Sequence, residues 1–217
     1  MADVKITHKS KTKYTLYKKG VRVDAKSPFG LLYPCVLVVG NSGSGKTTYC
    51  INMIKKRLTR KYDRIYLIAS SADSALINEL DIDPDFIFND VNDINQILTE
   101  SDGDSKIIIL DDMIASLKDN ESIMRLVIAC HHHSVCLIIT AHSSGSEIAP
   151  IIKKNHHALA LMPGLSAYDI RNISMYSPFN KKQLEASYAI ASKKKLPLTL
   201  ANVDLSFMIG FDKYKFV

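Results

Sequence analysis

The sequence predicts an α/β fold in which three layers enclose a mostly parallel central sheet, with antiparallel strands at an edge. The first observation is a set of short runs that are apolar throughout and rich in β-branched residues. Continuous apolar runs are typical of strands that helices cover on both faces. The second observation is that segments of helical pattern separate these runs. Such alternation favours parallel strands joined by right-handed crossovers.

The elements follow in order along the chain. Strands are expected at residues 35–39, 64–69, 106–110, 135–140 and 157–162. Helices are expected at residues 46–60, 73–80, 91–99, 120–132, 166–175 and 180–192. Asn120, Ser166 and Asn180 are suited to cap three of these helices at their N-termini. Residues 13–25 predict a short hairpin, and residues 196–217 predict two closing strands that form an antiparallel edge.

The chain of 217 residues contains no linker or repeat, so one domain is expected over residues 1–217. It comprises a basic N-terminal extension (1–30), a core (31–162) and a part with C-terminal helices and closing strands (163–217). No apolar run approaches the roughly 20 residues that span a bilayer, and the first residues lack a signal-peptide pattern. A soluble, intracellular protein is therefore expected.

The segment "GNSGSGKT", residues 40–47, follows the first core strand and precedes the first expected helix. Glycines at 40, 43 and 45 allow backbone angles with which the loop turns its N–H groups inward, and the helix N-terminus adds partial positive charge. With the ammonium of Lys46 these groups form a polyphosphate site, and the GxxxxGK[ST] spacing places the Thr47 hydroxyl on Mg²⁺. The expected ATP-binding residues are Gly40, Asn41, Ser42, Gly43, Ser44, Gly45, Lys46, Thr47 and Thr48. A chance glycine turn is the alternative, which the flanking strand and helix disfavour.

The run "KIIILDDM" ends in Asp111 and Asp112 at the carboxyl end of an expected strand, where ligands of α/β sheets lie. We expect Asp111 to hold Mg²⁺ through water and Asp112 to polarise the attacking water. The alternative is that two acids simply end a strand.

The run "VCLIITAHS" ends in Thr140 and His142. In P-loop motors with a strand between the phosphate loop and the acidic strand, a polar residue here touches the γ-phosphate or the attacking water. Both residues are therefore candidate sensors, and an ordinary strand-to-loop turn is the alternative. This three-strand plan predicts a P-loop NTPase of the ASCE or RecA-like type, with residues 31–162 as its nucleotide-binding core, and argues against small-molecule kinases.

The cysteines Cys35, Cys50, Cys130 and Cys136 lie in or beside apolar segments without CxxC spacing. This pattern indicates buried free thiols in a reducing compartment. The run "CHHHSVC" raises the hypothesis of a zinc site, but it lacks the paired spacings that structural zinc requires. A polar helix end that enters a buried strand explains it more simply.

The net charge of +6 and the isoelectric point near 9.0 point to a polyanionic partner, with nucleic acid the usual one. The basic residues cluster at residues 5–22, 55–61, 153–154, 181–182 and 193–195. Solvated lysines on helix faces are the alternative for any single cluster.

Four motifs occur in order over residues 36–162: "GNSGSGKT", "IIILDD", "HHHSVCLIITAHS" and "APIIKKNHHALALM". Together they resemble the FtsK–HerA lineage of P-loop ATPases, and within it the small genome-packaging ATPases of double-stranded DNA viruses, such as the poxvirus type. The resemblance implies Lys46 and Thr47 on phosphate and Mg²⁺, and Asp111 and Asp112 in metal binding and water activation. It places His142 where the family usually has a Gln sensor.

The resemblance also implies a cation that acts on the ATP of a neighbouring subunit. The family's Arg after a proline is matched by Lys153 in "PIIKKN", which we expect in a loop at the carboxyl side of the sheet. Arginine binds phosphate in a bidentate manner, whereas lysine supplies a point charge. Lys154, Arg171 and Arg125 are therefore alternatives.

The function that the resemblance implies is a homo-oligomeric ring, pentameric or hexameric, whose ATP hydrolysis drives double-stranded DNA into a preformed capsid. Capsid or membrane proteins at a packaging vertex would be partners, and the protein would act at the host-cell assembly site or in the virion. The alternatives are a helicase or partitioning ATPase, a nucleoside or nucleotide kinase, and a nucleotide-dependent switch with negligible turnover.

Overall fold

The computed structural model describes residues 6–8, 27–56, 58, 62–71, 74–100, 103–117, 120–142 and 148–216. The hairpin expected over residues 13–25 lies outside these ranges.

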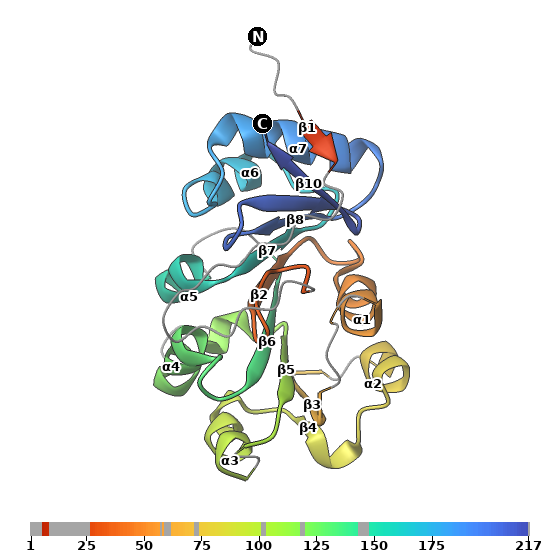
Figure 1. Cartoon of the computed structure of the whole chain (residues 1–217). Helices are drawn as coiled ribbons and strands as arrows, with labels where there is room; N and C mark the ends of the chain where they lie inside the picture. The colour runs from red at the N-terminus through yellow and green to blue at the C-terminus, as the bar shows by residue number, and fades with distance from the viewer. Residues whose placement is uncertain are drawn as a thin grey trace.

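The described strands form a single ten-stranded sheet. In chain order they are β1 (Ile6–His8), β2 (Cys35–Val39), β3 (Arg64–Ala69), β4 (Ile87–Phe88), β5 (Lys106–Asp111), β6 (Val135–Ala141), β7 (Ala158–Leu161), β8 (Leu198–Ala201), β9 (Ser206–Ile209) and β10 (Asp212–Phe216). Their order across the sheet is β1-β10-β9-β8-β7-β2-β6-β5-β3-β4. Figure 1 shows β4 at one end of this sheet and β1 at the other.

The sheet divides at β7 into a parallel and an antiparallel half. From β7 through β2, β6, β5 and β3 to β4, every pair is parallel. From β7 through β8, β9 and β10 to β1, every pair is antiparallel. Strand β6 lies between β2 and β5, as the three-strand plan requires. The carboxyl ends of these three strands therefore lie side by side.

Helices cover both faces of the sheet. Helices α1 (Lys46–Lys56) and α2 (Ser74–Leu80) lie on one face (Figure 1). The other face carries α3 (Ile94–Glu100), α4 (Glu121–Ala129), α5 (Pro150–Asn155), α6 (Ala167–Ser174) and α7 (Lys181–Lys193). Short 3-10 turns lie at Pro84–Phe86, Val91–Asp93 and Ile114–Leu117. The three-layer α/β class expected from the sequence is confirmed.

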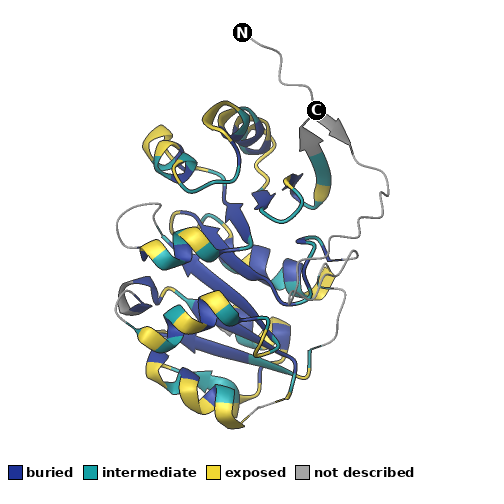
Figure 2. Cartoon of the chain, turned by 60° about the vertical axis from the view of Figure 1, so that its left-hand side comes forward, coloured by how far each residue is buried: buried dark blue, intermediate teal, exposed yellow. Residues whose placement is uncertain are grey.

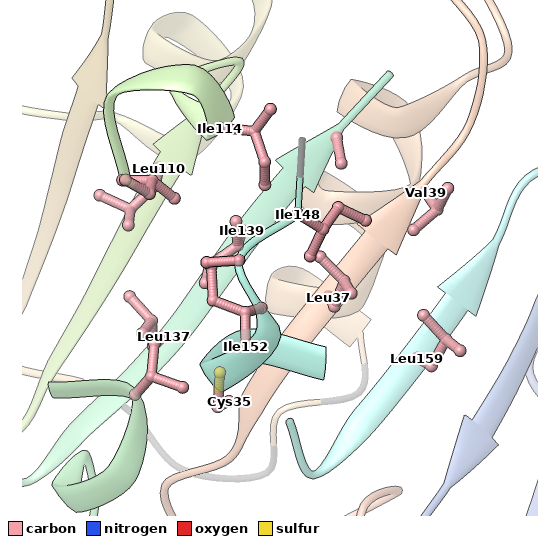
Figure 3. Packing of buried hydrophobic residues seen from close by; sticks show 14 of the residues in the cluster. Cys35, Leu37, Val39, Leu110, Ile114, Leu137, Ile139, Ile148, Ile152 and Leu159 are labelled. Atoms are coloured by element: carbon pink, nitrogen blue, oxygen red, sulfur yellow. The ribbon is translucent and has the colours of Figure 1, made fainter. Parts of the chain in front are cut away.

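The two core clusters follow the alternation of side chains along β2. Cys35, Leu37 and Val39 pack toward the face with α3 to α7, whereas Val36 and Val38 pack toward α1 and α2. Figure 3 shows Leu37 of β2 and Ile139 of β6 beside Ile152 of α5. Strands β2 and β6 are buried over their whole length, and exposed residues lie on the outer sides of the helices (Figure 2). The sheet centre is thus a rigid base for the loops at its carboxyl end.

Helix ends follow the expected capping chemistry. The side chains of Asn120, Ser166 and Asn180 accept hydrogen bonds from backbone N–H groups three residues further on. Ser166 and Asn180 form complete capping boxes. All three predicted N-caps are confirmed.

Strands β1 and β4 were not predicted, and three further features differ from the sequence prediction. The chain closes with three strands instead of two, because β10 turns back onto β9 after Gly210. Helix α5 was not expected, since six residues are too few for a helical periodicity to appear. The fourth predicted helix ends at Ala129 instead of residue 132, and residues 130–134 form turns that lead into β6.

Candidate nucleotide-binding site

The loop after β2 is held by its backbone. The N–H of Gly40 donates to the carbonyl of Ala141 at 3.0 Å, which ties the loop to β6. Gly43 and Gly45 have φ angles of +71° and +91°, which residues with a Cβ rarely adopt. Gly40 is not left-handed, so its expected special angle is wrong. It is required for a different reason: a Cβ there would lie 2.5 Å from the Cβ of Met162.

Lys46 opens α1 and is only 8% exposed. Its ammonium donates to the carbonyls of Gly40 at 2.9 Å and Asn41 at 3.2 Å. It also lies 2.9 Å from Nδ1 of His142. Burial lowers the pKa of Lys46, while the nearby carboxylates of Asp112 and Asp111 act in the opposite direction. The ammonium is thus held inside the loop, where a phosphate can replace its neutral partners.

His142 links Lys46 to the acidic strand. An ammonium only donates hydrogen bonds, so Nδ1 of His142 accepts and the proton of the neutral ring lies on Nε2. Nε2 lies 2.9 Å from Oδ2 of Asp112 and donates to it. The structure therefore connects Lys46, His142 and Asp112 in one chain of hydrogen bonds across β2, β6 and β5.

Thr140 orients the two acids. Its hydroxyl donates to Oδ1 of Asp111 at 2.7 Å and accepts from the N–H of Asp112 at 2.9 Å. Asp112 has a φ of +56°, a left-handed conformation in which a non-glycine residue is uncommon. The sharp turn directs the two carboxylates to different places. Thr140 itself is fully buried behind them, so it supports the acids and does not line the cavity.

These groups surround a cavity of about 600 Å³. It is lined by Ser42, Gly43, Gly45, Lys46, Thr47, Thr48, Ser70, Ser71, Asp111, Asp112 and His142. The structure therefore brings together residues from all three motifs of the sequence analysis. Ser70 and Ser71 were missed there, although two serines directly after the apolar run of β3 are a polar strand end of the same kind.

Two further observations suit this cavity to a nucleotide. The buried hydroxyl of Ser44 has no hydrogen-bond partner, as expected of a loop that surrounds a phosphate. Thr47 and Asp111 both line the cavity. A hydroxyl and a carboxylate are hard oxygen ligands of the kind that Mg²⁺ prefers.

Lys153 does not lie in this cavity. It belongs to helix α5 and not to a loop at the carboxyl side of the sheet, so that expectation is wrong. Its ammonium lies 5.6 Å from the ring centroid of Tyr176, and it lines a second cavity with Asn202. Asn202 follows β8, whose last residue pairs with the first residue of β7, so this cavity lies at the amino end of the parallel strands.

The alternative cations have different surroundings. The guanidinium of Arg125 lies 3.2 Å from the carboxylate of Glu121, within α4. Arg171 is exposed on α6, and its guanidinium has no partner among the described side chains. Lys154 is exposed beside Lys153.

The cysteines are part of the buried core. All four cysteines are buried and free, as predicted. Burial raises the pKa of Cys50 and of Cys130 to about 12, and the thiol of Cys130 donates to the carbonyl of Tyr33. Over the described ranges, no group of three His, Cys, Asp or Glu side chains is arranged to hold a metal ion. Nor is any helix there long and apolar enough to cross a membrane.

Comparisons with known proteins agree with this geometry. The sequence model of the poxvirus A32 protein family matches residues 26–97, which include the phosphate loop but end before Asp111. A search of curated protein sequences finds no match.

Solved structures resemble the fold. The genome-packaging NTPase B204 of Sulfolobus turreted icosahedral virus 2, in complex with AMPPCP, is 15% identical with a TM-score of 0.56, covering 82% of this chain and 96% of its own. The DNA-packaging ATPase B204 of Sulfolobus turreted icosahedral virus is 13% identical with a TM-score of 0.55, covering 84% and 97%. The conjugation coupling protein TcpA of pCW3, with ATPγS, is 11% identical with a TM-score of 0.57, covering 86% and 61%.

The fold is thus shared with P-loop ATPases, and the sequence match lies over the strand, loop and helix that hold Lys46. The chain has the fold of P-loop ATPases: it resembles the poxvirus A32 protein family in sequence over residues 26–97, and viral genome-packaging NTPases in fold.

Proposed function

We propose that this chain is an ATP-hydrolysing motor that moves double-stranded DNA into a viral capsid. The observation that carries the proposal is the single cavity in which the phosphate loop, the two acids and His142 meet. The packaging ATPases with the same fold, one of them bound to an ATP analogue, support this choice of motor. The likeness to a DNA-packaging ATPase supports DNA as the substrate that is moved.

In this proposal, each part of the site has one task. The inward N–H groups of the loop and the ammonium of Lys46 bind the β- and γ-phosphates. Thr47 and Asp111 would hold Mg²⁺, which neutralises charge on the phosphates. The carboxylate of Asp112, oriented by His142 and Thr140, accepts a proton from the attacking water.

Nucleotide binding changes the partners of Lys46. Its ammonium now bonds two carbonyls and His142, and a γ-phosphate is a stronger, charged acceptor. When Lys46 turns to the phosphate, Nδ1 of His142 loses its donor and becomes available to the attacking water. We propose that His142 senses the γ-phosphate in this way.

In the proposed ring, a cation from the neighbouring subunit would complete each ATP site. We propose Arg171 for this role, because its exposed guanidinium is unpartnered in the described part of the chain and can bind phosphate in a bidentate manner. Lys153, whose ammonium already lies over Tyr176, is the alternative. DNA would contact the exposed lysines at the two ends of α7, at 181–182 and 193–195.

One assay tests the proposal. ATP hydrolysis is measured with and without double-stranded DNA for the wild type, for Lys46→Ala and for the control Lys56→Ala on the exposed side of the same helix. We expect stimulation by DNA in the wild type and the control. Loss of a charged phosphate contact in Lys46→Ala costs on the order of 3 kcal/mol, a hundredfold or more in rate. Phosphate transfer to a nucleoside would show a kinase, and no turnover in the wild type would show a switch.

A further inference from the structure

The segment that follows β7, residues 162–165, lies between the phosphate loop and helix α7. A Cβ on Gly40 would lie 2.5 Å from the Cβ of Met162, so the phosphate loop and the segment touch at this point. The side-chain amide of Asn41 donates to the carbonyl of Gly164 at 3.0 Å. The phosphate loop is therefore bonded to this segment through one of its own side chains.

Helix α7 holds the segment from the other side. The hydroxyl of Tyr188 donates to the carbonyl of Met162 at 3.0 Å and accepts from the N–H of Leu165 at 2.8 Å. Tyr188 is 8% exposed, and both of these hydrogen bonds are buried. A single hydroxyl thus fixes both ends of the segment to α7.

Asn41 is the residue through which a bound phosphate can act on the segment. Its backbone carbonyl accepts from the N–H of Ser44 at 3.1 Å and from the ammonium of Lys46 at 3.2 Å. Both donors belong to the loop that binds the phosphates in the proposed function. A phosphate is a stronger, charged acceptor, so it competes for the N–H of Ser44 and draws the ammonium of Lys46 toward itself. The bonds that hold the peptide group of Asn41 therefore change when ATP binds.

The segment also leads to the helices that the proposed function assigns to the neighbouring subunit and to DNA. It continues directly into α6, which begins after the N-cap Ser166 and carries Arg171. Tyr188 lies within α7, between the exposed lysines at 181–182 and those at 193–195. One short segment thus contacts the ATP site on one side and these two helices on the other.

We propose that Tyr188 couples the ATP site to the lysines of α7, with residues 162–165 as the connection. This inference deepens the proposed function and rests on it. Tyr188 is a positioning residue, because it does not line the ATP cavity and acts through the segment that it holds. A nucleotide that moves Asn41 shifts this segment and, through Tyr188, the lysines of α7. By linkage, DNA bound to α7 changes the affinity for the nucleotide by the same factor.

Tyr188→Phe tests the coupling through the loss of one oxygen atom. The variant keeps the buried ring but removes the hydroxyl that bonds Met162 and Leu165. Tyr49→Phe is the matched control, because that buried hydroxyl bonds Thr199 of β8 instead. Thermal melting shows whether both variants are folded. Each is expected to melt below the wild type, since each leaves a buried polar group unpaired.

The coupling factor is the ratio of the affinities for a fluorescent DNA duplex with and without an ATP analogue. We expect the analogue to change the DNA affinity by about fivefold or more in the wild type and in Tyr49→Phe. In Tyr188→Phe the factor should fall toward one, while the affinity for each ligand alone stays within about twofold of the wild type. The same variant should hydrolyse ATP at the wild-type basal rate but gain little from DNA. A residue that only stabilises the fold would leave the coupling factor unchanged.

Asn41→Ala breaks the same connection from the other side. Alanine removes the amide that bonds Gly164 but keeps the backbone carbonyl that accepts from Ser44 and Lys46. We expect the coupling factor to fall as far as in Tyr188→Phe, and to fall no further when the two changes are combined. A double variant that loses coupling beyond either single variant would contradict a single connection. The side chain of Asn41 is exposed, so this variant carries the test if Tyr188→Phe does not fold.

Hydrogen exchange gives a second reading that does not need DNA. Binding of the ATP analogue should change the exchange of backbone N–H groups in α7 of the wild type and of Tyr49→Phe. It should leave the exchange in α7 of Tyr188→Phe unchanged. Equal changes in all three proteins would contradict the role of Tyr188.

Three results of the affinity measurements would overturn the inference. They are a coupling factor in Tyr188→Phe equal to that of the wild type, an equal loss of coupling in Tyr49→Phe, and a wild type that binds both ligands independently. Failure of the proposed function gives a different result. A wild type that binds no ATP analogue, or no DNA at low salt, would reject the motor itself.

Discussion

The ammonium of Lys46 lies 2.9 Å from Nδ1 of His142, although 96 positions separate the two residues in the chain. This contact joins Lys46, at the end of the phosphate loop, to the residue that directly follows β6. The three N–H groups of Lys46 bond Gly40, Asn41 and His142, so a γ-phosphate must displace one of these acceptors. In the proposed mechanism it displaces His142, which therefore opposes nucleotide binding and, once released, serves hydrolysis.

Replacing His142 by Ala should separate these two effects. Without the competing acceptor, the affinity for ATP should rise by roughly tenfold to a hundredfold, as expected for one hydrogen bond to a charged group. The hydrolysis rate should fall, because Asp112 loses the group that orients it. Binding of a fluorescent ATP analogue and single-turnover hydrolysis measure both, with the exposed His133→Ala as control. Weaker binding in His142→Ala would refute the competition.

The paired acids should differ on neutralisation. Asp112→Asn is expected to bind ATP with Mg²⁺ normally and to hydrolyse it about a hundredfold more slowly, because an amide accepts no proton. Asp111→Asn should instead lose the dependence of binding on Mg²⁺. ATP binding and hydrolysis are measured during titration of Mg²⁺ for each variant, with the exposed Asp212→Asn as the control. Equal loss of binding in both variants would reject the division of roles.

Thr140→Val tests a positioning role. The valine keeps the volume but removes the hydroxyl that bonds Asp111 and the N–H of Asp112. We expect kcat to fall about tenfold with little change in KM for ATP, because the acids shift while the phosphate loop stays in place. Thr199→Val is the matched control, since that buried hydroxyl bonds Tyr49 instead. Equal kcat values for the two variants would show that Thr140 is only structural.

Mixing inactive subunits identifies the cation that acts between neighbours. Arg171→Ala subunits should recover hydrolysis when mixed with Lys46→Ala subunits, because some contacts then pair an intact Lys46 with an intact Arg171. Lys153→Ala subunits should hydrolyse ATP without mixing, because Lys153 lies over Tyr176 and does not line the ATP cavity. Recovery with Lys153→Ala but not with Arg171→Ala would assign the role to Lys153.

DNA binding should weaken steeply with salt. Each phosphate that a lysine neutralises releases a counterion, so the logarithm of the affinity falls linearly with the logarithm of salt. Lys193, Lys194 and Lys195 are exposed at the end of α7, and their joint replacement by Ala should lower this slope by about one for each lysine in contact. Fluorescence anisotropy with duplexes of different sequence measures it, and Lys56→Ala is the control. An unchanged slope would place the DNA elsewhere.

The sequence was sufficient where local chemistry decides the outcome. The capping residues Asn120, Ser166 and Asn180 could be predicted because each accepts from an N–H group three positions away. The ends of β2, β5 and β6 could be predicted to within one residue because each apolar run stops there. The role of Gly40 could not be predicted from the sequence, since the side chain that excludes a Cβ there is Met162, which directly follows another strand. Nor could the setting of Lys153, which depends on Tyr176 and on the place where β8 joins the sheet.

The strand order has a consequence for synthesis of the chain. Strand β2 carries the phosphate loop but pairs only with β6 and β7, so both of its sheet partners emerge from the ribosome about a hundred residues later. Until then the loop has neither the carbonyl of Ala141 nor the ring of His142 to hold it. Such distant pairing is slow, because the intervening chain must close before any contact forms. Nascent chains arrested before residue 135 should therefore be unable to retain ATP, and nucleotide binding on the ribosome would report when the centre of the sheet is complete.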